Sequence, residues 1–433
     1  MPKIVFIGAG SGFGQRLCVD ILAHEELRDS TISLVDINEK YLGAVTDYVA
    51  ELIRRHDLPA RVEATTERRE VLDGADYVII SVAIGGPAYD GVPFYHEIAV
   101  PARYGVSQQV GDTVSVGAVF RMLRTGPEII RMARDIEELC PQAWVLNYTN
   151  PMAMLCWAMN AAARVNVVGL CHSVQGTAHQ LAGYLGVPSA EVNYWVAGIN
   201  HMSWFLELKR GREDLYPRLR EAADDPEIFA RDAVRFEILK HFGTFVTESS
   251  GHMSEYVPYF RKNPDLVEAY HLSQRLPRES PETDRRWEWF QEIRQQLEDS
   301  DPGQGLHASG EYASYIIRAI ETDEPFRFNG NVPNRGIITN LSPECCVEVP
   351  CLTDATGVRP CHVGELPPQL AALNMSNVAV QRLAVEAVLE RSKERAYHAV
   401  ALDPLSATQC SLPQLREMFE ELWTADSPWL TEY

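Results

Sequence analysis

The 433-residue sequence predicts an α/β protein built on a doubly wound parallel sheet. A short apolar run, Ile4 to Ile7, opens the chain and leads directly into a glycine-rich turn. Further apolar runs alternate with helical patterns, and they lie at 32–35, 77–83, 143–147 and 165–170. Strands that alternate with helices favour a parallel sheet, because each helix returns the chain to the starting end of the next strand. We therefore expect a Rossmann-like domain over residues 1–195.

The turn after the first run has the glycine spacing of a dinucleotide-binding site. Gly8 and Gly10 would let the backbone approach a pyrophosphate, and Ser11 and Phe13 lead into a helix whose free N–H groups would face that anion. Phe13 stands where a third glycine is usual, and Gly14 follows one residue later. The combination of strand, turn and helix still indicates a dinucleotide site, and a tight turn that binds nothing is the alternative.

Asp36 indicates which dinucleotide is bound. It ends the second apolar run, 26 residues after Gly10, where an acid accepts hydrogen bonds from the adenosine ribose. A carboxylate at this place also disfavours a 2′-phosphate. We therefore expect NAD rather than NADP.

Composition excludes several classes of partner. The formal net charge of −21 argues against nucleic acid and against anionic membrane surfaces. No charge-free apolar stretch reaches the roughly 18 residues of a membrane span, and the N-terminus lacks the pattern of a secretory signal. The nine cysteines show no disulfide spacing, so we expect them to be reduced in a cytoplasmic protein.

The second half, residues 196–433, is less regular and predicts an α+β domain interlocked with the first. Residues 194–208, across its start, are apolar with polar interruptions. Residues 336–352 predict strands, and residues 366–398 predict one or two long helices, because apolar residues recur there every three or four positions. In the first half, a helical pattern over 119–140 is interrupted at 125–127. We expect the ligand site to lie between the two halves.

Polar side chains follow the predicted strands, which is where doubly wound proteins bind ligands. Asn150 precedes Pro151, which favours an extended backbone and lets the amide project into the crevice. Cys171 and His172 come directly after the run at 165–170. A thiolate there would suit a metal, and a buried thiol beside a satisfied histidine is the alternative.

Asn200 and His201 form a second polar pair, after a further apolar run. If Cys171 and His201 converge in space, their thiolate and imidazole, with substrate hydroxyls, would suit Mn, Fe, Co or Ni. The stretch 247–256 carries another titratable cluster, in which Tyr256 could act as a base if a cation lowered its pKa. A polar surface turn is the alternative for that stretch.

Together these motifs resemble those of glycoside hydrolase family 4, the NAD- and metal-dependent glycosidases. The resemblance covers nearly the whole chain, and its strings are GAGS at 8–11, NYTNPM at 147–152, GLCHSVQGT at 169–177, AGINHM at 197–202, FVTESS at 245–250, CCVEV at 345–349 and LPPQLAA at 366–372. It implies an architecture like that of lactate and malate dehydrogenases. The string CHSVQGT is similar to the melibiase branch, whose members are α-galactosidases, while branches for 6-phosphorylated sugars carry other residues after the cysteine.

The resemblance implies ligand-binding roles for four of the matching positions. Cys171 and His201 would bind a divalent metal, for which we expect Mn²⁺. Asn150 and Asn200 would bind the hydroxyl groups of an α-glycoside next to that metal.

The resemblance also implies catalytic roles. Tyr256 would be the general base, with nearby Tyr259 as the alternative. His172 stands where some branches carry an acid that assists the leaving group, and Asp112 would contact the sugar or the metal site. In the implied reaction NAD takes a hydride from C3 of the sugar, and Tyr256 removes the proton that this oxidation makes acidic at C2. The substituent at C1 is then eliminated. Water adds to the product, and NADH returns the hydride. Such enzymes need no pair of catalytic carboxylates.

Several alternatives remain for the function. The segment Gly111–Thr113 departs from the melibiase pattern and resembles members that act on α-uronides, so an α-glucuronidase, an α-galacturonidase or an α-glucosidase is possible within the family. An NAD-dependent hydroxy-acid or sugar dehydrogenase is the alternative of another class, but it leaves the pair of Cys171 and His201 unexplained. A non-catalytic NAD sensor is the third. The resemblance alone implies a homodimer or homotetramer.

Overall fold

The computed structural model describes residues 1–86, 89–274, 276–279, 284–299 and 305–433. The first half of the chain supplies six parallel strands, which are β1 (Lys3–Ile7), β2 (Thr31–Val35), β3 (Arg61–Thr65), β4 (Tyr77–Ile80), β5 (Trp144–Asn147) and β6 (Asn166–Leu170). They lie in the order β3-β2-β1-β4-β5-β6. The chain runs outward from β1 in both directions, so the predicted doubly wound sheet is confirmed.

Helices connect these strands and cover the sheet. They are α1 (Gly14–Ala23), α2 (Glu39–Arg55), α3 (Arg69–Leu72), α4 (Val92–Arg103), α5 (Val116–Leu139), α6 (Met152–Ala162) and α7 (Ser173–Leu185). Helix α1 packs against α2, while α5 packs against α3, α4 and α6. All four residues of the central strand β4 are buried, as expected for a parallel strand inside its sheet.

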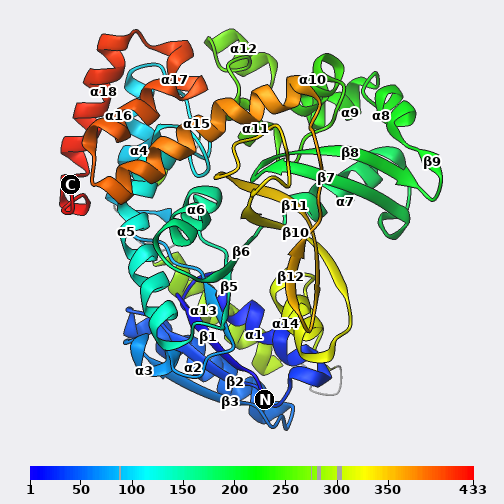
Figure 1. The fold of residues 1–433 in the computed structure, drawn as a ribbon, viewed down its shortest axis with the longest axis vertical. Helices are drawn as coiled ribbons and strands as arrows, with labels where there is room; N and C mark the ends of the chain where they lie inside the picture. The colour runs from blue at the N-terminus through cyan, green and yellow to red at the C-terminus, as the bar shows by residue number, and fades with distance from the viewer. Residues whose placement is uncertain (87–88, 275, 280–283, 300–304) are drawn as a thin grey trace.

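The second half continues the same sheet with antiparallel strands. They are β7 (Val192–Ile199), β8 (Met202–Arg210), β9 (Glu213–Asp214), β10 (Phe326–Pro333), β11 (Cys346–Asp354) and β12 (Gly357–Pro360). Strand β10 pairs with β6 on one side and with β11 on the other. The sheet then runs through β7, β8 and β9, toward the end of the molecule opposite the N-terminus (Figure 1). The two halves are therefore interlocked through backbone hydrogen bonds.

Eleven further helices are described in the second half. They are α8 (Tyr216–Ala222), α9 (Pro226–Arg231), α10 (Ala233–Phe242), α11 (Ser250–Tyr256), α12 (Pro264–Ala269), α13 (Arg285–Asp299), α14 (Tyr312–Thr322), α15 (Pro368–Glu390), α16 (Lys393–Leu402), α17 (Pro404–Gln409) and α18 (Leu412–Ala425). The long helix α15 packs against α5 and α6 and so joins the halves a second time. The helical prediction for 366–398 is confirmed.

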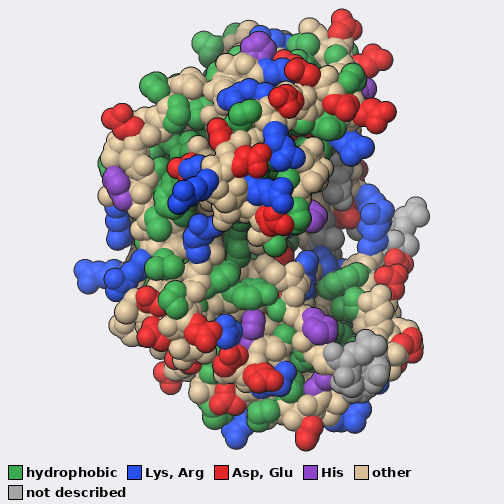
Figure 2. All heavy atoms as spheres, turned by 90° about the vertical axis from the view of Figure 1, so that its right-hand side faces the viewer, with side chains coloured by type: hydrophobic (Ala, Val, Ile, Leu, Met, Phe, Trp, Pro, Cys, Tyr) green, Lys and Arg blue, Asp and Glu red, His purple; other side chains and the backbone are tan. Residues whose placement is uncertain are grey.

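Among the helices of the described residues, none has both the length and the apolar character needed to cross a membrane. On the face drawn in Figure 2, acidic and basic side chains are intermixed.

All nine cysteines lie in the described part of the chain and are free, as expected, and only Cys171 and Cys361 are partly exposed.

The predicted break in the helix over 119–140 is wrong, because α5 continues through Pro127. A proline inside a helix removes the N–H that would bond to the carbonyl four residues earlier. Here that carbonyl belongs to Leu123, and the Tyr433 hydroxyl donates a hydrogen bond to it at 2.9 Å. A side chain from the far end of the chain thus compensates for the proline.

The predicted strands over 336–352 are only partly correct. Strand β11 begins at Cys346, and the preceding residues form a turn around Asn334. The buried Asn334 amide donates to the carbonyls of Ile338 and Ser342, each at 2.9 Å. Strand β10, which the sequence analysis did not identify, carries the join between the two halves.

Candidate active site

The turn after β1 leaves no room for a Cβ at Gly8 or at Gly10. Gly8 has a φ of +86°, and a Cβ on it would overlap the carbonyl of Ser81. A Cβ on Gly10 would lie 2.8 Å from the Asp36 Oδ2 atom. Asp36 follows β2, and its carboxylate accepts a hydrogen bond of 2.8 Å from the Gly10 N–H. The turn and the acid therefore meet, as a dinucleotide site requires.

Gly14 stands one residue after the usual place of the third glycine, and the packing of the turn explains this shift. A Cβ on Gly14 would overlap the carbonyl oxygen of Ala9, so Gly14 permits the close packing of α1 against β1. Phe13 is then free to place its ring 4.7 Å from the ring of Tyr148. Ser11 closes the turn by donating its N–H to the Gly8 carbonyl at 3.0 Å. A turn packed so closely that no Cβ fits at Gly8, Gly10 or Gly14, with Asp36 beside it, fits NAD.

Cys171 and His201 converge although they are 30 residues apart. Cys171 follows β6, and His201 stands at the tip of the β7–β8 hairpin with a φ of +61°. The Cys171 Sγ atom lies 3.2 Å from the His201 Nε2 atom. The strand ends therefore bring together a soft sulfur donor and an imidazole, the donor set that the sequence pattern suggested for a transition metal.

The other nitrogen of His201 is held by the protein. Its Nδ1 atom lies 2.6 Å from the Thr113 Oγ1 atom and 3.5 Å from the Tyr256 hydroxyl. Metal-binding histidines typically use one nitrogen for the ion while the other makes an orienting hydrogen bond. This arrangement leaves Nε2 as the nitrogen that faces the Cys171 side.

Negative groups dominate the electrostatics around His201. Burial by itself lowers the pKa of its imidazole, but the Cys171 sulfur and the carboxylates of Glu248 and Asp112 raise that pKa well above its ordinary value. Positive charge is therefore favoured at this position. The donor atoms and the charge both fit a divalent cation.

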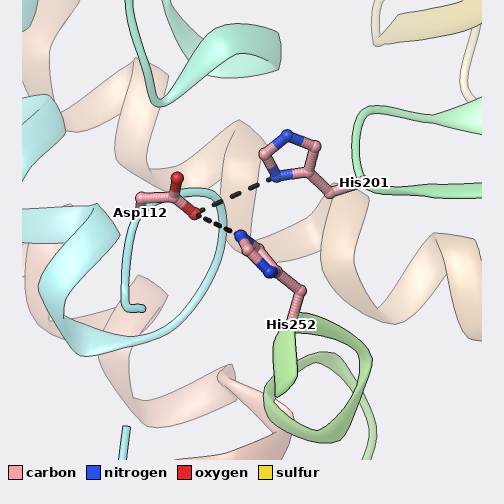
Figure 3. Close-up of side chains that lie close together, drawn as sticks. All are labelled: Asp112, His201 and His252. Carbon is pink, nitrogen blue, oxygen red and sulfur yellow. Dashed lines mark ion pairs between the residues drawn. The ribbon is translucent and has the colours of Figure 1, made fainter. Parts of the chain in front are cut away.

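Cys171, Thr113, His201 and Tyr256 are called the cluster below. Asp112 connects this cluster to His252 in helix α11 and to Asn150, which follows β5. As Figure 3 shows, it points from the loop before α5 toward His201 and His252. Its Oδ1 atom lies 3.9 Å from His201 Nδ1 and 3.8 Å from His252 Nε2. The Asn150 amide donates to Asp112 Oδ2 at 3.0 Å. Burial raises the pKa of Asp112, but the two histidines and Arg121 outweigh it, so the net pKa is lowered.

A buried carboxylate shapes the loop that carries Asp112. Glu255 accepts hydrogen bonds from the N–H groups of Val110 at 2.8 Å and Gly111 at 3.0 Å, and also from that of Gln109. Consecutive backbone N–H groups that converge on one carboxylate form an anion-binding nest. Glu255 of the 247–256 stretch thus has a positioning role.

The sequence analysis did not single out Glu248 or His252, although both lie in the titratable stretch. The Glu248 Oε2 atom lies 3.6 Å from His201 Nε2, on the Cys171 side. Its Oε1 atom lies 3.5 Å from His252 Nδ1. The available signals were the density of titratable residues between 247 and 256 and the family string at 245–250, which contains Glu248. Neither assigns a role, because the convergence on His201 depends on the fold.

The two candidate bases have very different environments. Tyr256 is 1% exposed and its hydroxyl reaches His201, whereas Tyr259 is 41% exposed and its ring packs near Phe242. Burial, and then the negative charges of Asp112 and Glu255, raise the pKa of Tyr256 well above its ordinary value. Tyr256 is the tyrosine at the cluster, and it would need a nearby cation to ionise.

His172 and Asn200 lie at different depths. The His172 side chain is 63% exposed, and its Nδ1 atom lies 3.9 Å from the buried carboxylate of Glu311, so it is outside the buried cluster. Asn200 is 1% exposed, and neither polar atom of its amide has a hydrogen-bond partner among the described residues. An unpaired buried amide beside His201 fits a site that binds polar ligand atoms.

Comparisons with known proteins match this chain over its whole length to one family. The family model for family 4 glycosyl hydrolases matches residues 3–187, and the model for their C-terminal domain matches residues 196–406. An α-galactosidase from Bacillus subtilis (strain 168) is 40% identical over 440 residues, covering 100% of both chains. An α-galactosidase from Rhizobium meliloti (strain 1021) is 37% identical over 443 residues, covering 100% of this chain and 89% of the other.

Solved structures share the fold. A putative glucosidase from Bacillus subtilis has a TM-score of 0.83 at 27% identity, with 98% of this chain and 99% of that chain covered. A 6-phospho-α-glucosidase from gut microorganisms, in complex with NAD and Mn²⁺, has a TM-score of 0.79 at 20% identity over 99% and 98% of the two chains. The malate dehydrogenase of Plasmodium falciparum gives 0.53 at 13% identity over 92% and 100%. The chain belongs to glycosyl hydrolase family 4, as its motifs predicted.

Proposed function

We propose that the protein is an α-galactosidase that requires NAD and a divalent metal, with Mn²⁺ as the expected ion. The observation that carries this proposal is the full-length identity of 40% to a protein named an α-galactosidase. A second such relative, at 37%, supports the same glycone. The substrate would be a small α-galactoside.

The residues of two sites would hold the cofactors. Gly8, Gly10, Ser11 and Phe13 would surround the pyrophosphate, while Asp36 would receive the ribose hydroxyls. Cys171 and His201 would bind the metal. When bound, NAD accepts and returns a hydride at C3 of the sugar, and the metal polarises the oxygens on C2 and C3.

The side chains of the cluster would do the remaining work. Asn150, Asn200 and Asp112 would orient the sugar hydroxyls. Tyr256 would remove the proton from C2, and the cation would lower its pKa for this step. His172, at the exposed rim, would deliver a proton to the leaving oxygen, with Glu311 holding its ring.

The charges of the site favour a neutral sugar. Asp112 and Glu248 both face the cluster with carboxylates, and Cys171 adds a thiol. Even with a divalent cation bound at the site, Asp112 and Glu248 would repel a uronate or a phosphate that lay beside their carboxylates. The Gly111–Thr113 segment is the observation that favours an α-galacturonide instead, and a 28% identical relative is named an α-galacturonidase.

The experiment measures aglycone release from p-nitrophenyl α-galactoside, α-glucoside and α-glucuronide, and reducing-sugar release from an α-galacturonide. Each is tested with and without NAD, Mn²⁺ and a reductant. We expect release from the galactoside that requires NAD and metal, without accumulation of NADH. Release without NAD would overturn the mechanism. Stoichiometric NADH without aglycone would indicate a dehydrogenase, and NAD binding without any turnover would indicate a sensor.

Three further features belong to the proposal. The chain divides into an NAD-binding domain over residues 1–195 and a substrate, metal and oligomerisation domain over 196–433. The protein acts in the cytoplasm and assembles as a homodimer or homotetramer, for which light scattering during size-exclusion chromatography gives the mass.

A further inference from the structure

We propose that Glu248 is the third protein ligand of the metal, beside Cys171 and His201. This inference rests on the metal dependence in the proposed function, and it adds an oxygen donor to which the sequence analysis assigned no role. It assigns a role to a residue that the proposed reaction otherwise leaves unused.

The first observation is the convergence of three donor atoms from three different elements. The Cys171 Sγ, His201 Nε2 and Glu248 ligand atoms all lie within 4.8 Å of one another. Cys171 follows β6, His201 is at the hairpin tip, and Glu248 is in the segment before α11. One ion could therefore contact all three. A carboxylate oxygen is also the donor that Mn²⁺ prefers to sulfur.

The second observation is the backbone of Glu248, which has a φ of +75°. A non-glycine residue in this region costs free energy and persists only where its surroundings determine it. His201, at +61°, is in the same region. Two of the three donors thus come from residues held in an unfavourable conformation, as is common at functional sites.

A buried arginine holds Glu248 in place. The Arg235 guanidinium donates to the Glu248 carbonyl, and its Nε atom donates to Asp232 at 2.8 Å. The Glu248 N–H donates to Thr177 Oγ1 at 3.2 Å. Both backbone polar groups of Glu248 are therefore satisfied by side chains. Its carboxylate faces two histidines, with Oε2 3.6 Å from His201 Nε2 and Oε1 3.5 Å from His252 Nδ1.

Asp112 is the competing acid, and the geometry places it on the other side of His201. Asp112 faces the Nδ1 atom at 3.9 Å, and that nitrogen already contacts Thr113. Glu248 faces the Nε2 atom, which also faces Cys171. An ion on Nε2 would bind Glu248, while Asp112 would remain free for the sugar.

The test measures Mn²⁺ binding directly, by electron paramagnetic resonance of free Mn²⁺, with the full-length protein and saturating NAD. The variants are Glu248→Gln, Glu248→Asp and the matched control Asp112→Asn. We expect Glu248→Gln to weaken Mn²⁺ binding about tenfold or more, and Asp112→Asn to change it by less than about threefold. Glu248→Asp keeps the charge but shortens the arm, so a ligand role predicts weaker binding there too.

Two controls separate ligation from misfolding. NAD affinity and melting temperature are measured for every variant, and the thiolate-to-cobalt absorption band in Co²⁺-loaded protein reports whether Cys171 still binds. We expect Glu248→Gln to keep that band at higher Co²⁺ concentration. Unchanged Mn²⁺ affinity in Glu248→Gln, or an equal loss in Asp112→Asn, overturns the inference while the proposed function stands. Absence of Mn²⁺ binding and of metal-dependent activity in the wild type overturns both.

Discussion

At the scale of single residues, the site is organised by the two nitrogens of His201. One faces Cys171 and Glu248, and the other contacts Thr113 and Tyr256. The ring therefore separates a side that would bind the metal from a side that would handle protons. Substitutions on the two sides should have different effects.

Replacing Tyr256 with Phe removes the hydroxyl that would take the C2 proton. We expect kcat to fall by about 10²–10⁴ while NAD and Mn²⁺ affinities change little. Exchange of the C2 hydrogen with deuterated solvent should be lost in parallel. Tyr259→Phe is the control and should retain activity, because its ring packs away from the cluster. Full activity in Tyr256→Phe would assign the base to another group, such as His252.

His172 should matter only when the leaving group needs a proton. We expect His172→Asn to slow hydrolysis of galactosides with alkyl leaving groups by about tenfold or more, and to affect p-nitrophenyl galactoside little, because p-nitrophenolate departs without protonation. The measurement is kcat/KM across leaving groups of different pKa. Glu311→Gln, which changes the partner of His172, should produce a weaker form of the same pattern. Equal losses for all leaving groups would contradict the assignment.

At the scale of elements, strand ends and turns position the site. The β1 turn and the tip of the β7–β8 hairpin each have a backbone conformation that few residues adopt, and a Cβ on Gly169 in β6 would lie 2.5 Å from the Met152 sulfur. The loop before α5 is held by the nest around Glu255. These elements bring the candidate site residues together because the shared sheet sets the distances between them.

The substitution Gly10→Ala tests whether the turn after β1 binds NAD. Its Cβ would lie 2.7 Å from the Tyr41 Cβ and 2.8 Å from Asp36 Oδ2, so the turn and the acid would have to separate. We expect NAD affinity to fall about tenfold or more, measured by calorimetry. Gly183→Ala is the control, because nothing lies within 4 Å of its Cβ in helix α7. That variant should keep NAD affinity and gain about 0.5–1 kcal/mol in stability. Normal NAD binding by Gly10→Ala would place the nucleotide elsewhere.

At the scale of the whole molecule, one sheet joins both halves and buries polar groups at the join. Glu348 on β11 is fully buried where β11 pairs with β7. Its carboxyl oxygens lie 2.8 Å from Ser203 Oγ and 3.3 Å from Asn331 Nδ2. Burial raises the pKa of Glu348 to about 7. We therefore expect the stability of the join to depend on pH.

The folded protein keeps the Glu348 proton up to about pH 7, whereas the unfolded chain loses it near the ordinary glutamate pKa. The folded state thus binds more protons in this window, and the free energy of unfolding decreases as pH rises through it. We expect Glu348→Gln to reduce the stability loss between pH 5 and pH 8 by about 2–3 kcal/mol, measured by denaturant unfolding. Glu207→Gln, an exposed acid on β8, should match the wild type. A wild-type slope in Glu348→Gln would contradict the assignment.

Prediction from sequence succeeded where the signal was local. The five parallel strands marked by apolar runs were located within a few residues, and the family and fold class are confirmed. It failed where distant residues decide, as in α5, where Tyr433 satisfies the carbonyl that Pro127 leaves free. It also missed β10, whose edges pair with strands far away in the sequence. The roles of the site residues stay predictions.

The sequence by itself determined the alternation of strands and helices, the glycine turn with Asp36, and the strand-end motifs that identify the family. These depend on local backbone preferences and on spacing along the chain. Only the tertiary structure decided that Glu248 and Cys171 share one nitrogen of His201, that Asp112 takes the other side, and that Tyr256 rather than Tyr259 reaches the cluster. The physical reason is that the sheet and the packed α11 set these distances, and no local pattern records them.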